Sequence, residues 1–319
     1  MSVPSWLGDI QLVTFDCFGT LLDWRRGLAT VEIEEERDFA EFMDACAVLQ
    51  SQERHVSYKQ VLKDTIRKLR PKLRPAVIGL FADDLGRVPA FFDSRGAVGS
   101  LQDMVQVGVL SNCDANHQLD VISTLRVAWD VCITSQEIRA YKPSDRAWDA
   151  IVRMGVARTA ATRDSWLHVS AFDKKDLIPA RGRGLRTCHV RRPGGDAKAT
   201  ADMFIDSLDE LVAMMMAAKQ GPVLFEVAST TTDDDTRARL RSWLVGERMP
   251  SMREVGGMRD ARLVELKDGT LVERYTFGGS HDVEAYEETF AAGHRALVRE
   301  NFGDSVTRTT SEALVRGHA

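Results

Sequence analysis

Residues 12–24 read LVTFDCFGTLLDW, and this stretch decides how the rest of the chain is interpreted. An apolar run ends in Asp16, and Gly19 and Thr20 follow within four residues. A glycine lets the chain turn sharply away from a strand. The pattern therefore predicts a buried strand with an aspartate at its carboxyl end. Phe18 stands two residues after Asp16, so no second acid accompanies the carboxylate there.

Further apolar runs have the length of strands. Besides 10–16 (IQLVTFD), they are 105–112 (VQVGVLSN), 130–135 (DVCITS), 165–171 (SWLHVSA) and 185–192 (LRTCHVRR). Short runs rich in Val and Ile, with helical patterns between them, predict a parallel sheet covered on both faces. The segment 25–90 has helical periodicity and almost no strand signal. We therefore expect a helical cap inserted after the first strand.

The pattern changes after a closing helix predicted over 208–222. A strand (VLFEVAST), a helix with an acidic start, two strands around a Lys-Asp-Gly-Thr turn, a helix and a last strand follow. The order βαββαβ is typical of a split-βαβ, ferredoxin-like unit. The predicted fold class is α/β, with a Rossmann-like parallel sheet and a helical cap, plus a C-terminal α+β ferredoxin-like domain. We place the domains at 1–220, with the cap at about 25–90, and at 222–319.

Composition narrows the classes of function. The net charge of -5 and the pI of about 5.9 argue against a general nucleic-acid binder. Five scattered cysteines without a CxxC pair favour a reducing compartment. The sequence shows no signal-peptide pattern, and no stretch approaches the roughly 18 apolar residues of a membrane span. We expect a cytoplasmic protein with neither a nucleic acid nor a membrane as partner.

Polar side chains follow each of the first four predicted strands. In a parallel sheet the carboxyl ends of the strands form the site. An aspartate there can act as a nucleophile and form a covalent ester or acyl phosphate, and a nearby lysine would keep it ionised. Hydroxyl and amide groups would supply further donors. The residues are Asp16 with Thr20, Ser111 with Asn112, Lys142, and Asp173 with Asp176.

The ordered set FDCFGTLLDW, VLSNCD, AYKPSDRAW and VSAFDKKDLIPARGRGL resembles the four motifs of the haloacid dehalogenase-like hydrolase superfamily. Within it, the chain is most similar to the type II, L-2-haloacid dehalogenase-like group, over roughly 8–215. The resemblance implies that Asp16 is the nucleophile, that Thr20 stabilises its loop, that Lys142 pairs with Asp16, and that Asp176 lies beside Lys142. It also implies a set of substrate-binding residues, Ser111, Asn112, Phe18 and Ser170.

Phe18 bears on the reaction. Phosphatases of this superfamily usually carry an acid two residues after the nucleophile, which protonates the leaving oxygen. A halide leaving group needs no proton, so Phe18 favours displacement at carbon. We predict a hydrolase that displaces halide from a small 2-halocarboxylate through an ester on Asp16. It would need no cofactor and no metal, because Lys142 balances the charge.

Two features depart from the dehalogenase pattern. Dehalogenases of this group have a Ser-x-Asn pair early in the fourth motif. The equivalent stretch SAFDKKD has Ser170 but then Phe172 and Asp173, so the asparagine that would position the hydrolytic water is absent. A cap arginine should bind the substrate carboxylate, and the candidates are Arg25, Arg26, Arg37 and Arg54.

Two alternatives stay open. One is a Mg²⁺-dependent phosphatase of the same superfamily, in which Asp173 and Asp176 would complete a metal site with Asp16. The other is a non-catalytic binding or regulatory protein on this fold. The C-terminal stretch ERMPSMREVGGMRDARLVEL resembles small dimeric α/β-barrel domains, which implies a homodimer.

Overall fold

The computed structural model describes residues 3–219 and 221–314. These divide into two compact units, Asp9–Val212 and a second made of 3–8 with 213–314. We call the first the core-and-cap unit and the second the C-terminal unit; the helix α10 (Leu208–Lys219) crosses the boundary between them. Among the described residues no helix is both long and apolar enough to cross a bilayer.

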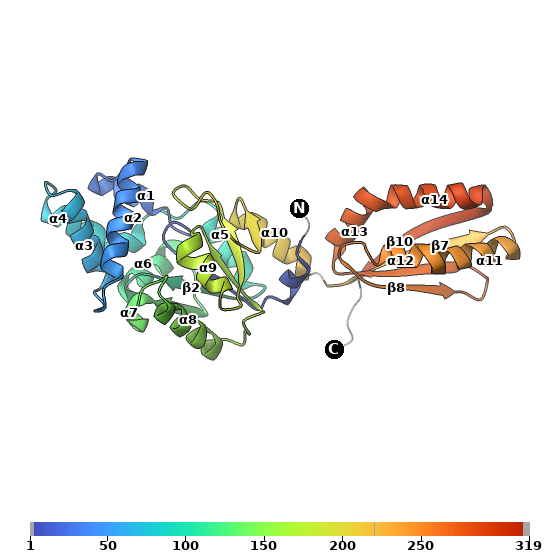
Figure 1. The fold of residues 1–319 in the computed structure, drawn as a ribbon, viewed down its shortest axis with the longest axis horizontal. Coiled ribbons are helices and arrows are strands. Elements are labelled where there is room, and N and C mark those ends of the chain that lie inside the picture. The colour runs from blue at the N-terminus through green and yellow to red at the C-terminus, as the bar shows by residue number, and fades with distance from the viewer. Residues whose placement is uncertain (1–2, 220, 315–319) are drawn as a thin grey trace. The chain divides into compact units, whose positions relative to one another are not determined.

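A six-stranded parallel sheet forms the centre of the core-and-cap unit (Figure 1). Its order is β3-β2-β1-β4-β5-β6, which confirms the predicted fold class. Five strands fall in the five predicted runs, and β6 was missed because it has three residues. The bounds are β1 (Leu12–Phe15), β2 (Gln106–Ser111), β3 (Val131–Thr134), β4 (Trp166–Ser170), β5 (Arg186–Val190) and β6 (Met203–Ile205). The main helices that connect them are α5 (Ser94–Gln102), α6 (Ala115–Leu125), α7 (Ser135–Ile138), α8 (Asp145–Arg158) and α9 (Ile178–Arg181).

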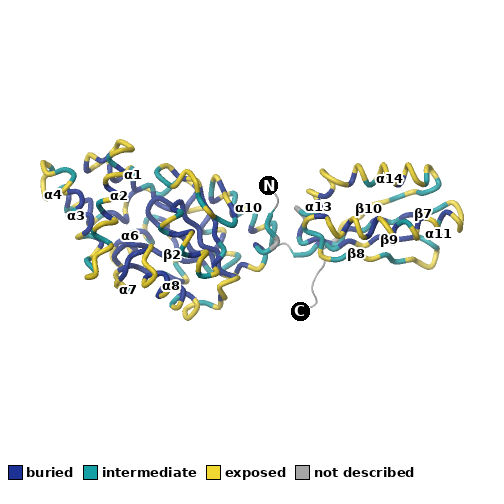
Figure 2. Tube along the Cα trace, viewed as in Figure 1, coloured by how far each residue is buried: buried dark blue, intermediate teal, exposed yellow. Residues whose placement is uncertain are grey.

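The strand order places a switch point at β1. From β1 the chain goes to β2 and β3 on one side, and then returns to β4, β5 and β6 on the other. In open parallel sheets a crevice forms where the order reverses, beyond the carboxyl ends of the strands. The strands themselves are buried (Figure 2), and Trp148 and Trp166 are part of the apolar cluster that packs against them. The ends of β1 and β4 therefore define the region in which to look for a site.

Four helices occupy the segment for which the sequence predicts a cap. They are α1 (Trp24–Leu28), α2 (Glu36–Gln50), α3 (Tyr58–Leu69) and α4 (Pro75–Asp83). Helix α3 buries Tyr58, Leu62 and Ile66 along one face, which is the spacing of an amphipathic helix. Asp114, just after β2, accepts hydrogen bonds from the backbone N–H groups of Tyr58 (3.0 Å) and Lys59 (2.9 Å). This carboxylate ties the start of α3 to the sheet domain.

The C-terminal unit has an antiparallel sheet with the order β10-β7-β9-β8. Strands and helices alternate as βαββαβ, which is the predicted order. Asp233 accepts a hydrogen bond from the Thr236 N–H at 2.7 Å, so the acidic run does begin a helix. The bounds are β7 (Val223–Thr231), α11 (Asp234–Trp243), α12 (Met249–Met252), β8 (Met258–Glu265), β9 (Leu271–Phe277), α13 (Ser280–Tyr286), α14 (Ala292–Phe302) and β10 (Val306–Leu314).

Candidate active site

Asp16 follows β1 directly and is almost fully buried. Its Oδ2 accepts a hydrogen bond from the Thr20 hydroxyl at 3.1 Å, and its Oδ1 lies 3.0 Å from Lys142 Nζ. Gly19 has φ of 88°, and a Cβ there would lie 2.8 Å from the Phe172 ring. Only glycine allows this turn without strain. The turn brings the Thr20 hydroxyl back to the carboxylate.

Lys142 joins the two carboxylates of the site. Besides Asp16, its Nζ contacts Asp176 Oδ1 at 2.5 Å and donates to the Leu110 carbonyl at 2.7 Å. The ammonium group thus donates two hydrogen bonds and forms an ion pair with Asp176. Asn112 holds the backbone of Lys142, because its Oδ1 accepts from the Lys142 N–H and its Nδ2 donates to the Lys142 carbonyl, each at 2.8 Å. Both ends of the lysine are thus fixed.

Asp176 lies in a π-helical turn, Asp173–Leu177, after β4. Its Oδ2 accepts from the Ser170 hydroxyl at 3.0 Å, and its Oδ1 lies 3.5 Å from His168 Nε2. His168 is fully buried in β4. Inside the apolar run SWLHVSA this histidine has the pattern of a core position, so the sequence offers no signal of its contact with Asp176. Ser170, His168 and Lys142 thus surround the Asp176 carboxylate. The same lysine also contacts Asp16.

The charges of the lysine and Asp176 stabilise each other. Burial alone would lower the pKa of Lys142, but Asp16 and Asp176 hold it above the ordinary value of 10.5. Burial alone would raise the pKa of Asp176, but Lys142, with His168 and Lys175, holds it below the ordinary value of 3.8. Both groups are therefore charged at neutral pH.

This pair makes stability dependent on pH. The folded-state pKa of Asp176 is depressed, so its contribution is present above 3.8 and is lost as pH falls through the folded value. The folded-state pKa of Lys142 is raised, so its contribution is present below 10.5 and is lost as pH rises through the folded value. We expect Asp176→Asn to lower the free energy of unfolding at neutral pH and the difference from wild type to shrink below about pH 4. Urea unfolding between about pH 2 and pH 7 measures this. A difference that stays constant with pH would contradict the assignment.

A second buried ion pair supports the loop that follows Asp16. Arg192 forms a two-pronged pair with Asp93 at 2.7 and 3.0 Å, and its Nε donates to the Thr20 carbonyl at 3.0 Å. Since the Thr20 hydroxyl donates to Asp16, this ion pair helps to fix the residue that orients the carboxylate. The sequence offers no signal for it, because Arg192 follows another arginine and Asp93 lies 99 residues away.

A cavity of about 320 Å³ opens between the sheet domain and the cap. Lys142 lies in its wall, and so does Lys175, whose Nζ is 4.0 Å from Asp16 Oδ1 and 5.2 Å from the centre of the Phe172 ring. The sheet side contributes Lys142, Pro143, Phe172, Lys174, Lys175 and Asp196, and the cap side contributes Trp24, Met43, Asp44, Cys46, Ala47, Gln50 and Tyr58. Asp16 thus lies next to a cavity, and Asp44 and Gln50 are the polar side chains at the end of the cap helix that lines it.

The expected substrate-binding residues lie around this cavity rather than in its wall. Asn112 and Ser170 have their polar groups engaged, because Asn112 holds Lys142 and Ser170 holds Asp176. Phe18 is buried, and so is Ser111, whose hydroxyl has no hydrogen-bond partner within the part of the chain that the structure describes. Contact of these four with a substrate stays a prediction.

The cap arginine expected at the substrate carboxylate is not in the cavity wall. Arg25 stacks on Phe39 at 4.6 Å and pairs with Glu36 at 2.7 Å. Arg37 is exposed beside Glu41, and Arg26 and Arg54 are exposed as well. The described residues of the cavity wall include no arginine, and lysines are its cations.

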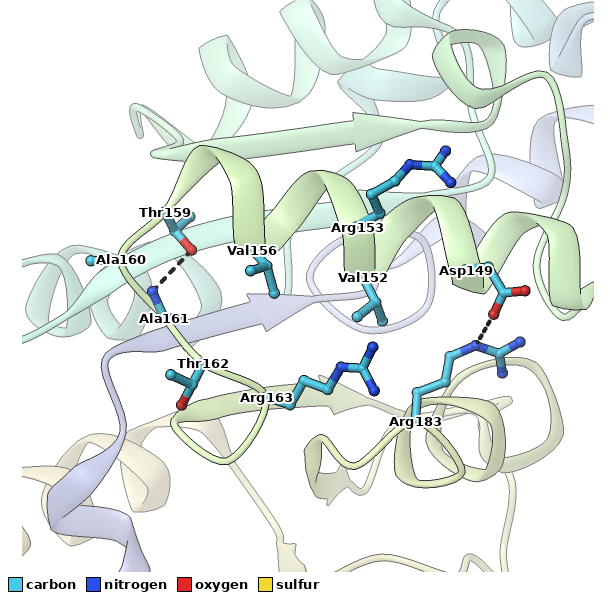
Figure 3. A pocket seen from close by; sticks show the side chains of 10 residues that line it. All are labelled: Asp149, Val152, Arg153, Val156, Thr159, Ala160, Ala161, Thr162, Arg163 and Arg183. Carbon is cyan, nitrogen blue, oxygen red and sulfur yellow. Dashed lines mark hydrogen bonds and ion pairs between the residues drawn. The ribbon is translucent and has the colours of Figure 1, made fainter.

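A larger hollow of about 710 Å³ lies elsewhere in the same unit (Figure 3). It is bordered by α8 and by the loop that leads into β4. It therefore lies near the amino end of β4, whereas the predicted site residues follow the carboxyl ends of the strands. Asp149 and Arg183 in its wall pair with each other at 2.9 Å, as Figure 3 shows. The hollow includes none of the predicted catalytic residues, so the smaller cavity beside Asp16 is the candidate active site.

The carboxylate of Asp173 has a backbone partner. Its Oδ1 accepts a hydrogen bond from the Thr200 N–H at 2.7 Å. Across residues 3–219 and 221–314, no group of three or more His, Cys, Asp or Glu side chains is placed to hold a metal ion. Both oxygens of Asp176 are engaged by Ser170 and Lys142. The described side chains therefore offer no preformed cluster of three carboxylates for Mg²⁺, and metal independence stays a prediction.

Comparison with known proteins gives likeness only at the level of structure. No family model and no curated protein matches the sequence. Among solved structures, the chain is similar to an L-2-haloacid dehalogenase from Xanthobacter autotrophicus with chloropropionic acid covalently bound (TM-score 0.56, 14% identity, 65% of this chain and 98% of that chain). It is also similar to a defluorinating L-2-haloacid dehalogenase (TM-score 0.54, 21% identity, 68% of this chain and 99% of that chain). A third is a hydrolase of the same superfamily from Bacillus subtilis bound to magnesium (0.51, 16%, 65% and 99%).

The share of the chain that is covered agrees with the size of the core-and-cap unit, which has 204 of the 319 residues. Identities this low establish a fold and leave the reaction to be argued from the side chains. The part of the chain that these structures cover, 65–68% of it, has the fold of the haloacid dehalogenase-like hydrolases, with L-2-haloacid dehalogenases among its structural neighbours.

Proposed function

We propose that this protein is a hydrolase that displaces halide from a small 2-halocarboxylate through an ester on Asp16. The observation that carries the proposal is the Asp16 carboxylate, buried beside a cavity and paired with Lys142. Phe18 occupies the position from which a general acid would protonate a leaving oxygen. A halide leaves without a proton.

The reaction would proceed in two steps. An oxygen of Asp16 attacks the carbon that carries the halogen, the carbon–halogen bond breaks, and the halide leaves with the bonding electrons. Water then attacks the carbonyl carbon of the Asp16 ester, and the carbon–oxygen bond between that carbonyl and the product breaks. The products are a 2-hydroxy acid, a halide ion and a proton. Lys142 and Thr20 orient the carboxylate for the first step and stabilise it again after the second.

Lys175 is our candidate for the group that binds the substrate carboxylate. It is the cation in the cavity wall nearest Asp16 whose ammonium is not already shared between two carboxylates. About a fifth of its side chain is exposed (21%), so it can reach a ligand. A small 2-halocarboxylate bound there has its reacting carbon next to its charged end, close to Asp16. Lys175 would thus replace the expected cap arginine.

Chloride release from L-2-chloropropionate in EDTA tests the proposal. We expect release by the wild type and a KM at least about tenfold higher in Lys175→Gln, because a charge-assisted contact to the substrate is lost. Lys198→Gln is the matched control, since Lys198 is an exposed lysine outside the cavity wall. An unchanged KM in Lys175→Gln would refute the role of Lys175, and no chloride release by the wild type would refute the reaction.

The Mg²⁺-dependent phosphatase is the rival reading, and the neighbour from Bacillus subtilis has magnesium bound. The positions of Asp173 and Asp176 argue against it here. Metal independence, a carboxylate substrate and a homodimer belong to our proposal.

A further inference from the structure

A buried cluster of charged side chains lies on the sheet of the C-terminal unit. Glu273 on β9 is fully buried. Its Oε2 accepts a hydrogen bond from Arg248 Nε at 3.2 Å and another from the Tyr275 hydroxyl. Its Oε1 accepts from Arg308 on β10. Two guanidinium groups therefore share one carboxylate.

The cluster carries an excess of positive charge. Burial and the negative charge of Glu273 raise the pKa of Tyr275, which therefore stays neutral. Burial, Arg248 and Arg308 lower the pKa of His294 to about 4, so this imidazole is neutral at pH 7. Among the groups of the cluster that the structure describes, two cations face one anion. Buried charge without a counter-charge is unfavourable.

The same two arginines have unused donors. Arg248 Nη1 and Arg308 Nε are buried and have no hydrogen-bond partner among the described residues. Only 2% of the Arg248 side chain is exposed. Nearly all buried donors in proteins are paired, and leaving a charged one unpaired is costly. A bound anion would neutralise the excess positive charge and could accept hydrogen bonds from these two unpaired donors.

A cavity of about 710 Å³ reaches this cluster from the side of α14 and the start of β10. Arg308 lies in its wall and belongs to the cluster as well, so it connects the two. Arg295 and Arg299 on α14 line the cavity and are exposed. Val298 and Val306 add apolar surface. Glu300 and Asp304 also lie in the wall, so its three arginines face two carboxylates and remain in excess. Guanidinium groups match the planar, two-oxygen geometry of carboxylate and phosphate.

We propose that the C-terminal unit binds a small molecule through an oxyanion group, a carboxylate or a phosphate, in the cavity between α14 and β10. Arg308 is the principal contact and brings the ligand charge to the Arg248–Glu273 cluster. Arg295 and Arg299 bind at the mouth of the cavity, and the valines contact the rest of the ligand. This site is independent of the hydrolase reaction proposed for the core-and-cap unit.

Calorimetric titration of the full chain tests the site. The probes are inorganic phosphate and hexanoate, at an ionic strength held constant with potassium chloride. We expect Arg308→Gln to weaken binding of the preferred probe by about tenfold or more. In this variant Glu273 still pairs with Arg248, so the buried carboxylate retains a counter-charge. The double variant Arg295→Gln/Arg299→Gln provides a second test at exposed positions. Arg274→Gln is the matched control, because Arg274 pairs with Glu226 at 2.6 Å, apart from the cluster.

A local readout distinguishes this site from the cavity beside Asp16. The His294 ring contacts the Tyr286 hydroxyl and the Phe290 ring, and Arg248 and Arg308 lower its pKa. A bound anion offsets the two arginines, so the NMR titration of His294 should shift to higher pH when the probe is present. His294→Gln identifies the resonance. Binding that survives Arg308→Gln without any change at His294, or no binding of either probe, would overturn the proposal.

Discussion

Replacing Asp16 with asparagine is expected to lower kcat for halide release by on the order of 10⁴-fold or more. The amide oxygen is a poor nucleophile, so the ester on which the proposed reaction depends cannot form at a useful rate. The fold should persist, because Lys142 keeps its contacts with Asp176 and with the Leu110 carbonyl. Steady-state chloride release, with circular dichroism as a check of folding, measures the effect.

Asp103→Asn is the matched control for this variant. Asp103 is exposed at the end of α5, and its substitution removes the same charge away from the cavity. We expect this control to keep the wild-type kcat. If a folded Asp16→Asn variant keeps more than about a tenth of the wild-type kcat, Asp16 is not the nucleophile.

Replacing Lys142 with methionine should lower the free energy of unfolding more than Asp176→Asn or Lys174→Met does. Methionine is similar in length but leaves Asp16 and Asp176 buried beside each other without their shared cation. Removing one partner of a buried ion pair typically costs about 3–5 kcal/mol of folding free energy. Thermal and urea unfolding of Lys142→Met measure the loss. Catalysis should be lost as well, because Asp16 would lose the ammonium group that orients its carboxylate.

Two further variants separate the charge effect from packing. Lys174→Met, at an exposed position two residues before Asp176, should change the free energy of unfolding by less than about 1 kcal/mol. Adding Asp176→Asn to Lys142→Met should restore part of the lost stability, because one unpaired buried charge is removed. If the double variant is no more stable than Lys142→Met, the loss has another cause.

Strand order explains why the central residues could be predicted together. Asp16, Lys142 and Asp176 are far apart in the sequence, but each follows a strand of a parallel sheet. The carboxyl ends of such strands meet at one edge. Thr20 was also predictable, since Gly19 allows the turn that returns its hydroxyl to Asp16. Side chains fixed by topology were therefore within reach of the sequence.

Roles that depend on which atom faces which partner were out of reach. The motif containing Asn112 suggested a substrate contact, which stays a prediction, but it did not indicate that the Asn112 amide holds the backbone of Lys142. His168 has the pattern of a core residue until Asp176 is seen beside it. Arg192 donates to the Thr20 carbonyl only because the fold brings the residues after β5 next to the loop that follows Asp16. Among the described residues of the cavity wall the cations are Lys142, Lys174 and Lys175, a set that the four candidate cap arginines did not predict.

The C-terminal cluster did leave a signal in the sequence that we did not use. In LVERYTF, residues at alternate positions share one face of the strand. Leu271, Glu273, Tyr275 and Phe277 are all fully buried. A glutamate in register with an apolar face indicates a buried partner of opposite charge. The identity of Arg248 and Arg308 as its partners required the fold.

The most direct test of the central claim is an oxygen-labelling experiment. The protein is allowed to turn over L-2-chloropropionate for several cycles in H₂¹⁸O with EDTA, and the peptide that contains Asp16 is analysed by mass spectrometry. Water attacks the ester at the Asp16 carbonyl carbon, so the account predicts ¹⁸O in the Asp16 carboxylate. In a single turnover the lactate should receive its new oxygen from unlabelled Asp16. Labelled lactate in the first turnover, with Asp16 unlabelled, would mean that water attacks the substrate directly and would contradict the account.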